Sequence, residues 1–232
     1  MSSLQASDHE LEEGAGRSQV STLDLDRRQI RDLLESWVVW RDAGEWDRLA
    51  TVWHDDAWMM TTWSRSPASD FMARSQAGFD RGSEVLHMLG GSVIDVEGTR
   101  AVAQSKVEIT QRAEVHGVLV DVHCKARFID ALEVRDGRWG IVFRQPVYDL
   151  DRMSPVDPKQ TLALDEKVLS QFPSGYRHLA YLQTMQGMEV YRDMPGTRGP
   201  ELKVLRQRMA RWLAGEPATI LSPEDAETVT RS

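Results

Sequence analysis

The chain has 232 residues, of which 41% are hydrophobic and 28% charged, a composition typical of globular domains. Its net charge of -8 and its scattered Lys and Arg residues argue against binding to nucleic-acid phosphates through a concentrated positive field. The single cysteine, Cys124, excludes an internal disulfide and any zinc site that needs two thiolates. No apolar run approaches the roughly 20 residues of a membrane span. The N-terminus lacks the pattern of a secretory signal, so we expect a cytoplasmic protein.

The N-terminal part of the sequence predicts helices. Residues 1–22 are polar, small and acidic without periodicity, which predicts a disordered tail. Apolar residues then recur at three- and four-residue spacing between Ile30 and Val38, which is typical of an amphipathic helix. Asp24 or Asp26 can cap the start of this helix, and Gly44 ends it. The following elements are expected to be a short helix from residue 46 to 52 or 53, a turn at 54–57, a strand at 58–63, a loop at 64–69 and a helix at 70–79.

Strands are predicted for most of the chain between residues 86 and 150. Four segments are expected to form them: residues 86–97, 100–115, 118–134 and 139–144. Asp136-Gly137, between the last two segments, is the strongest short signal for a hairpin. Because helices come first and long antiparallel strands follow, the order predicts an α+β fold with the helices on one face of a curved sheet.

The composition changes again beyond Pro155. Helices are predicted at residues 176–190 and 201–213, and Gly215 and Pro217 end the second of them. Their apolar positions need a surface to cover, so we expect a helical extension packed on the main domain. The predicted organisation is therefore a tail at residues 1–22, a domain at 23–153 and a C-terminal extension at 154–232.

Several motifs together resemble a known family. A Trp-rich helix ends in Asp-x-Gly-x-Trp-x-x-Leu (residues 42–49), Trp-His-Asp-Asp-Ala follows (residues 53–57), and the last hairpin carries Asp-Gly-Arg-Trp (residues 136–139). Over residues 24–152 this pattern resembles the SnoaL-like branch of the nuclear-transport-factor-2-like superfamily. The resemblance implies a cone of curved antiparallel sheet closed by the N-terminal helices, an α+β barrel. Residues 42–49 also resemble scytalone dehydratase, and residues 49–57 hexachlorocyclohexane dehydrochlorinase.

The resemblance implies a catalytic pair formed by Asp42 and His87. In both enzyme families an acid at the position of Asp42 orients a histidine at the position of His87, which takes a proton as an alkene forms. Neither enzyme needs a metal or an organic cofactor, so none is expected here.

The local sequence is compatible with this pair and with structural roles. Asp42 lies at the C-terminal end of a helix, where the helix dipole disfavours an anion unless a partner compensates. His87 lies in the apolar segment 85–89, where a neutral imidazole needs a partner for its ring N–H. Alone, Asp42 is equally well a solvated acid in a turn, and His87 a core histidine bonded to a carbonyl. Paired as the resemblance implies, they predict a general base with an orienting carboxylate.

Further candidates lie on the strand 118–134. Period two places His123, Lys125 and Arg127 on one face of this strand. If that face turns inward, Lys125 or His123 can stabilise developing negative charge, and the resemblance places a second pocket histidine near Lys125. If it turns outward, it meets solvent or a subunit interface. The side chains predicted to bind substrate are Trp40, Trp58, Trp63, Arg65, Arg144 and Tyr148.

The sequence therefore predicts a cofactor-independent lyase of the dehydratase or retro-aldol (deformylase) type. Its substrate is expected to be a bulky aromatic or polycyclic small molecule. The same His87–Asp42 pair can serve an isomerase or a cyclase, and the superfamily also contains non-catalytic modules that bind small molecules or other proteins. By resemblance, a homo-oligomer (dimer or trimer) is expected, and no nucleic acid, membrane or metal is expected to bind.

Overall fold

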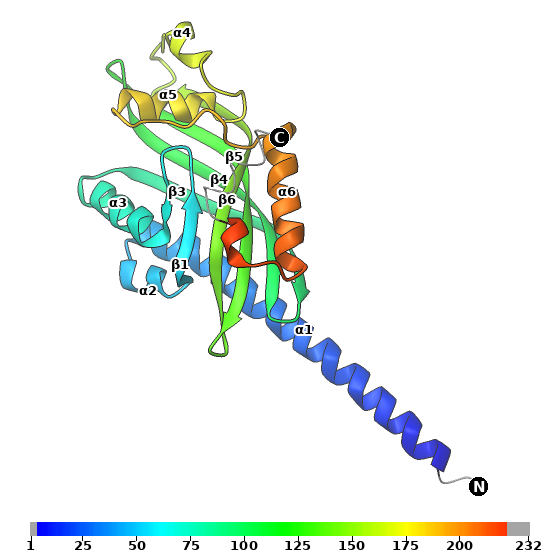
Figure 1. Cartoon of the computed structure of the whole chain (residues 1–232). Coiled ribbons are helices and arrows are strands. Elements are labelled where there is room, and N and C mark those ends of the chain that lie inside the picture. The colour runs from blue at the N-terminus through cyan, green and yellow to red at the C-terminus, as the bar shows by residue number, and fades with distance from the viewer. Residues whose placement is uncertain (1–3, 222–232) are drawn as a thin grey trace.

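A curved six-stranded sheet forms the centre of the molecule and has helices on both faces (Figure 1). The computed structural model describes residues 4–221, and their side chains from Thr22 onward except that of Ile220. The strand order is β2-β1-β6-β5-β4-β3, so the sheet is open, with β2 and β3 at its two edges. The predicted α+β class with a curved sheet and a C-terminal helix is confirmed.

Three helices precede or interrupt the first strands: α1 (Leu4–Ala43), α2 (Trp46–Ala50) and α3 (Ala68–Asp80). The buried positions of α1 lie three or four residues apart, from Ile30 to Val38, which is why this face packs on the sheet. The prediction that the helix starts at Asp24 or Asp26 was wrong, because α1 begins at Leu4 and runs through most of the polar segment 1–22. Residues 1–3 lie outside the described part of the chain.

Gly44 makes the tight connection between α1 and α2. Its φ of 72° lies in the left-handed region that favours glycine. A Cβ atom at this position would lie 2.9 Å from the ring of Phe79 on α3. Gly44 therefore ends α1 and lets α3 approach closely, as the sequence predicted for the end of the helix.

The strands are β1 (Trp53–Met60), β2 (Arg65–Pro67), β3 (Glu84–Glu97), β4 (Arg100–Val115), β5 (Val118–Arg135) and β6 (Arg138–Pro155). Strands β3 to β6 form an antiparallel meander. The turn between β5 and β6 has positive φ at both Asp136 and Gly137, as the two-residue hairpin requires.

The sheet departs from the predicted one at β1. The segment 54–57, predicted as a turn, belongs to β1, and the segment 65–67, predicted as loop, forms β2. Strand β1 pairs with β6 in parallel, so the sheet is mixed rather than wholly antiparallel. Strand β6 also continues past its predicted end at Arg144. Pro146 lies just past the last residue that pairs with β1, where a strand tolerates the missing N–H.

The segment after β6 contributes α4 (Glu166–Leu169), α5 (Arg177–Met185), α6 (Pro200–Leu213) and the 3₁₀ helix η1 (Ala218–Leu221). Helix α5 crosses one end of the sheet and α6 lies along it, in front of the sheet in Figure 1. The buried carboxylate of Asp151 on β6 accepts hydrogen bonds from the backbone N–H groups of His178 (2.6 Å) and Leu179 (2.8 Å) at the start of α5. This contact holds α5 against the sheet.

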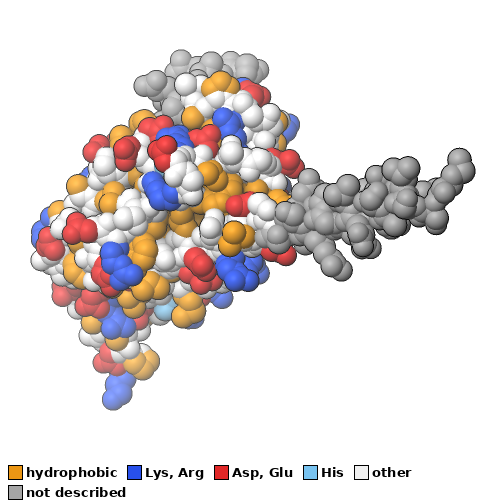
Figure 2. Space-filling view, turned by 90° about the horizontal axis from the view of Figure 1, so that it is seen from below, with side chains coloured by type: hydrophobic (Ala, Val, Ile, Leu, Met, Phe, Trp, Pro, Cys, Tyr) orange, Lys and Arg blue, Asp and Glu red, His pale blue; other side chains and the backbone are white. Residues whose placement is uncertain are grey.

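The surface carries both signs of charge. On the face shown in Figure 2, acidic and basic side chains are interspersed, and hydrophobic side chains reach the surface between them. No helix in the described part of the chain is long and apolar enough to cross a membrane.

Candidate active site

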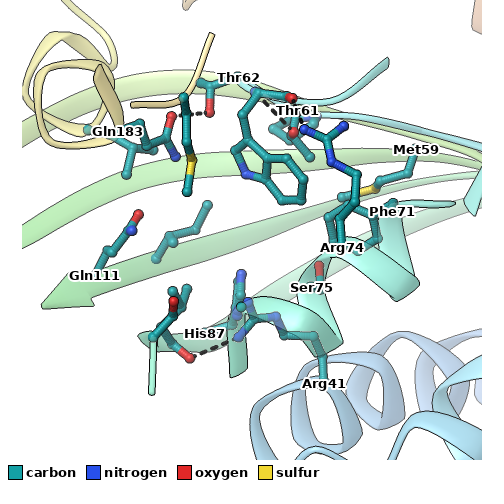
Figure 3. A pocket seen from close by; sticks show the side chains of 18 of the residues that line it. Arg41, Met59, Thr61, Thr62, Phe71, Arg74, Ser75, His87, Gln111 and Gln183 are labelled. Carbon is teal, nitrogen blue, oxygen red and sulfur yellow. Dashed lines mark hydrogen bonds between the residues drawn. The ribbon is translucent and has the colours of Figure 1, made fainter. Parts of the chain in front are cut away.

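A cavity of about 370 Å³ lies between the sheet and helices α1, α3 and α5 (Figure 3). Most of its lining is apolar, which suits a bulky organic ligand. His87 and Arg41 lie on one side of the cavity, and Thr62 and Gln183 on the opposite side. The lining also includes Trp37, Trp63, Phe71, Arg74, Ser75, Arg81, Phe128, Tyr148, Leu179 and Met188.

Asp42 and His87 are in direct contact, as predicted from the sequence. Nδ1 of His87 lies 2.8 Å from Oδ1 of Asp42, and the backbone N–H of His87 donates to Oδ2 at 2.5 Å. Because a carboxylate only accepts hydrogen bonds, this contact places the ring proton on Nδ1 and leaves a lone pair on Nε2. Within the described residues no hydrogen bond reaches Nε2, and His87 lines the cavity. The arrangement therefore presents a basic nitrogen to a ligand.

Arg41 joins the end of α1 to the start of β3. Its Nη1 donates to the carbonyl oxygen of Val85 at 3.0 Å and to Oδ1 of Asp42 at 3.3 Å. The carboxylate of Asp42 sits at the unfavourable, negative end of the α1 dipole. The guanidinium of Arg41 and the two N–H donors of His87 compensate for that position. The same contacts fix the orientation of the imidazole.

The surroundings of His87 favour its neutral form. Burial is the largest effect and lowers the pKa of His87, whose side chain is only 7% exposed. The hydrogen bond to Asp42 opposes this shift, whereas the positive charges of Arg41 and Arg144 add to it. At neutral pH the imidazole is therefore uncharged and able to accept a proton.

The lowered pKa of His87 predicts a loss of stability in acid. The unfolded chain binds a proton at this histidine below pH about 6.5, whereas the folded protein does not. Above that pH, protonation of His87 does not reduce the free energy of unfolding. As the pH drops from about 6.5 toward the lowered pKa, the free energy of unfolding falls with a slope of at most about 1.4 kcal/mol per pH unit.

Urea denaturation between pH 5 and pH 8 measures this slope. The wild type is expected to lose more stability on acidification than His87→Asn, which has no titrating group at this position. His123→Gln is the matched control, because His123 lies on the face of the sheet away from the cavity. Equal pH dependence of the wild type and His87→Asn would contradict the prediction.

A buried ion pair lies beneath the histidine. Trp37 meets the ring of His87 edge-on at 5.3 Å, and Phe128 lies 6.4 Å away. The guanidinium of Arg144 packs against both of these aromatic rings, 4.5 and 4.4 Å from their centroids. Its Nε donates to Asp130 at 2.5 Å, and neither side chain has any solvent exposure. Burial raises the pKa of Asp130, and Arg144 opposes that rise.

Of the six predicted substrate-binding residues, two line the cavity, Trp63 and Tyr148. Burial raises the pKa of Tyr148, so its hydroxyl stays protonated and can donate a hydrogen bond. The other four do not line the cavity. Trp40 packs against Arg48 and Trp58 against the core, Arg65 bonds to Asp193 beside Tyr191, and Arg144 lies under the cavity floor.

His123 and Lys125 face away from the cavity. The neighbouring positions Val122, Cys124 and Ala126 are buried, so the period of two turns His123 and Lys125 to the opposite face. Nδ1 of His123 lies 3.2 Å from Glu108, and Lys125 is exposed. The alternative in which this basic face turns inward was therefore wrong, because the small apolar side chains take the core side.

Several lining residues were not identified from the sequence. Ser75 lies one turn after Phe71 on α3. The only sequence pattern that could have placed Ser75 at the cavity is the helical face that it shares with Phe71. Gln183 and Leu179 come from α5, in the segment predicted only to pack on the domain. Thr62 donates to Oε1 of Gln183 at 2.7 Å, which joins that segment to the cavity wall. No sequence pattern marked Gln183 as a cavity residue, because the residues around it are typical of an ordinary amphipathic helix.

The acidic pair Asp55 and Asp56 lies outside the cavity. Asp56 pairs with Arg135 at 2.6 Å on the surface, and this contact lowers the pKa of Asp56. Within the described residues, no group of three or more His, Cys, Asp or Glu side chains is placed to hold a metal ion.

The fold and the cavity define a small α+β protein whose curved sheet encloses a ligand-sized space. The SnoaL-like domain family matches residues 24–145, more than half of the chain. A PEP2-like protein of Fusarium vanettenii is 40% identical over 209 residues, which cover 85% of this chain and 90% of that protein. Pea pathogenicity protein 2 of the same organism is 40% identical over 206 residues, 84% of this chain and 88% of that protein. The chain belongs to the SnoaL-like domain family, as the sequence motifs predicted.

Among solved structures, the crystal structure of LinA is similar in fold. It has a TM-score of 0.50 and 19% sequence identity, and the match covers 64% of this chain and 99% of LinA. The matches to the two Fusarium vanettenii proteins are too long to end at residue 153, so they include part of the segment that carries α5 and α6. These relatives therefore share sequence beyond the SnoaL-like domain.

Proposed function

We propose that the protein is a cofactor-independent lyase in which His87 acts as the general base and Asp42 orients it. The observation that carries the proposal is the direction of the imidazole. Nδ1 is bonded to Asp42 at 2.8 Å, while Nε2 has no partner among the described residues and the ring lines the cavity. A buried neutral histidine held in this way combines a fixed tautomer with a free basic nitrogen.

The proposed reaction begins when Nε2 of His87 takes a proton from a carbon atom of the substrate. The electrons of the broken C–H bond form a C=C bond, and the leaving group departs with the electrons of its own bond to carbon. Asp42 stabilises the imidazolium that results. The imidazolium then returns its proton to the leaving group or to water. For retro-aldol cleavage, the same nitrogen takes the proton from a hydroxyl group, whose electrons form a C=O bond. The adjacent C–C bond breaks, its electron pair leaves with the departing carbon atom, and that atom takes the proton back from the imidazolium.

The cavity supports a bulky and largely apolar substrate. Trp37, Phe71 and Phe128 supply aromatic walls close to the imidazole. A volume of about 370 Å³ lies at the lower end of the range for sites that bind small organic molecules. Thr62, Gln183 and Tyr148 add a few polar groups on the opposite side, where they can fix the orientation of a ligand.

Hydrogen–deuterium exchange tests the proposal before the natural substrate is known. The wild type, with no added metal or cofactor, is incubated in D₂O with a panel of aromatic and polycyclic carbon acids that carry β-hydroxyl, β-halide or aldehyde groups. We expect deuterium incorporation or loss of the leaving group, detected by NMR and mass spectrometry. Exchange without loss of a group would favour an isomerase. Binding of panel members with neither exchange nor product would indicate a non-catalytic binding module.

A further inference from the structure

The charged side chains that line the cavity are all basic. They are Arg41, Arg74 and Arg81, and no Asp or Glu lines the cavity within the described residues. This lining contrasts with the net charge of -8 for the whole chain. Asp42 offsets one of the three charges through its contact with Arg41. In the described part of the chain, Arg74 bonds only to neutral acceptors, the hydroxyl of Ser64 and the carbonyl oxygen of Trp63. The cavity thus keeps an excess of positive charge.

One edge of the Arg41 guanidinium has no hydrogen-bond partner among the described residues. All hydrogen bonds of Arg41 to described residues use Nη1. Nε is buried without a partner, and Nη2 bonds to no described residue. The N–H bonds of Nε and Nη2 lie in the guanidinium plane and point in the same direction along one edge, so together they match the two oxygens of a carboxylate. A buried polar group without a partner costs free energy, so a ligand group that accepts hydrogen bonds at this edge is stabilising.

A second donor without a partner lies on the same cavity. The hydroxyl of Ser75 is buried and has no hydrogen-bond partner in the structure. Ser75 lies on α3 between Arg41 and Arg74 in Figure 3. Nε1 of Trp37, which also lines the cavity, is a third buried donor without a partner. Three buried side chains that line one cavity, each with an unused donor, indicate that the missing partner is a group that accepts several hydrogen bonds.

We propose that the substrate is an organic anion, an aromatic or polycyclic body that carries a carboxylate, and that Arg41 binds this carboxylate beside His87. Arg74 and Arg81, which are exposed and line the cavity, attract the anion at its opening. The inference rests on the proposed function in that it assigns the substrate class of the same cavity. Binding by Arg41 sets the distance between the carboxylate and the carbon atom from which His87 removes the proton.

A pair of probes of equal shape tests this proposal by isothermal titration calorimetry. 2-Naphthoate carries a carboxylate, and 2-naphthamide carries a neutral amide on the same ring system. We expect 2-naphthoate to bind the wild type at least tenfold more tightly than 2-naphthamide. In Arg41→Met the affinity for 2-naphthoate is expected to fall about 10- to 100-fold, while that for 2-naphthamide changes less than about threefold.

Lys125→Met is the matched control, because it removes one exposed positive charge from the face away from the cavity. It is expected to keep the preference for 2-naphthoate. Arg41→Lys keeps the charge but lacks the paired donors. It replaces Arg41→Met as the test variant if circular dichroism shows that Arg41→Met does not fold. The affinity of Arg41→Lys for 2-naphthoate is expected to be at least severalfold lower than that of the wild type.

Equal affinities of the wild type for the two probes would overturn the proposal. So would undetectable binding of 2-naphthoate, or an unchanged preference in the folded Arg41 variant. These outcomes are distinct from failure of the proposed function, because binding requires no turnover. A preserved preference without deuterium exchange on any carbon acid would reject only the base role of His87, and exchange without a preference would reject only the anion site.

Discussion

Replacing His87 by asparagine is expected to slow deuterium exchange and product formation by about 10²–10⁴-fold, the range that a positioned general base supplies. Asparagine can keep a donor near the position of Nδ1 and so retain the contact with Asp42, but it has no basic nitrogen at the position of Nε2. The change therefore removes the base and preserves the shape of the site. Initial rates with the most reactive carbon acid of the panel measure the effect, and circular dichroism shows whether the fold is intact.

A double variant that combines Asp42→Asn with His87→Asn tests whether the two residues act together. Asp42→Asn is expected to lower the rate as well, because the imidazolium loses its counter-charge and the ring its fixed tautomer. If Asp42 acts through His87, the double variant is no slower than His87→Asn alone. His123→Gln should leave the rate unchanged, since His123 contacts Glu108 and Thr110 on the other face of the sheet. A folded His87→Asn protein with wild-type rates would show that another group takes the proton.

Breaking the buried pair between Arg144 and Asp130 is expected to have the largest effect on stability. Both side chains are fully buried, so Asp130→Asn or Arg144→Met leaves an uncompensated partner in the core. Removal of one member of such a pair costs about 3–5 kcal/mol of unfolding free energy. Arg144→Met also removes the guanidinium that packs against Trp37 and Phe128, the two aromatic rings beside His87. Urea denaturation followed by tryptophan fluorescence measures the loss.

Asp130→Leu combined with Arg144→Met distinguishes the cost of an unpaired charge from the cost of lost packing. The double variant should be more stable than either single variant, because neither change leaves a charge unpaired. Arg127 and Asp149 form a matched pair on the outer face, where the contact is 2.8 Å long but partly exposed. Arg127→Met is expected to cost about 1 kcal/mol or less. Losses of equal size at the two pairs would contradict the prediction.

The sequence predicted the fold wherever the pattern was local. The strands β3, β4 and β5 match their predicted limits within a few residues, because alternation defines these segments and the turn at Asp136-Gly137 marks the end of β5. The start of α1, strand β1 and the length of β6 were missed. Strand β1 depends on its pairing with β6, more than 80 residues away in the sequence, and no local pattern records such a partner.

The contact between Asp42 and His87 was predicted by resemblance rather than by a local pattern. Family motifs placed Asp42 and His87 together across 45 residues, and the structure shows that contact. The orientation of the strand with His123 and Lys125 needed the packing of its small apolar face, which periodicity alone leaves open. No role for Arg41 was predicted from the sequence. Its unused donor edge becomes visible only when all its neighbours are in place.

Helix α5 has a consequence for how this protein and its relatives can diverge. The pair of Asp42 and His87 comes from α1 and β3, whereas Leu179, Gln183 and Met188 reach the cavity from the segment after β6. A substitution in that segment reshapes the cavity without touching the pair. Natural selection can therefore alter which molecule fits while the proton-accepting group is inherited unchanged, so related proteins with different segments after β6 need not share a ligand.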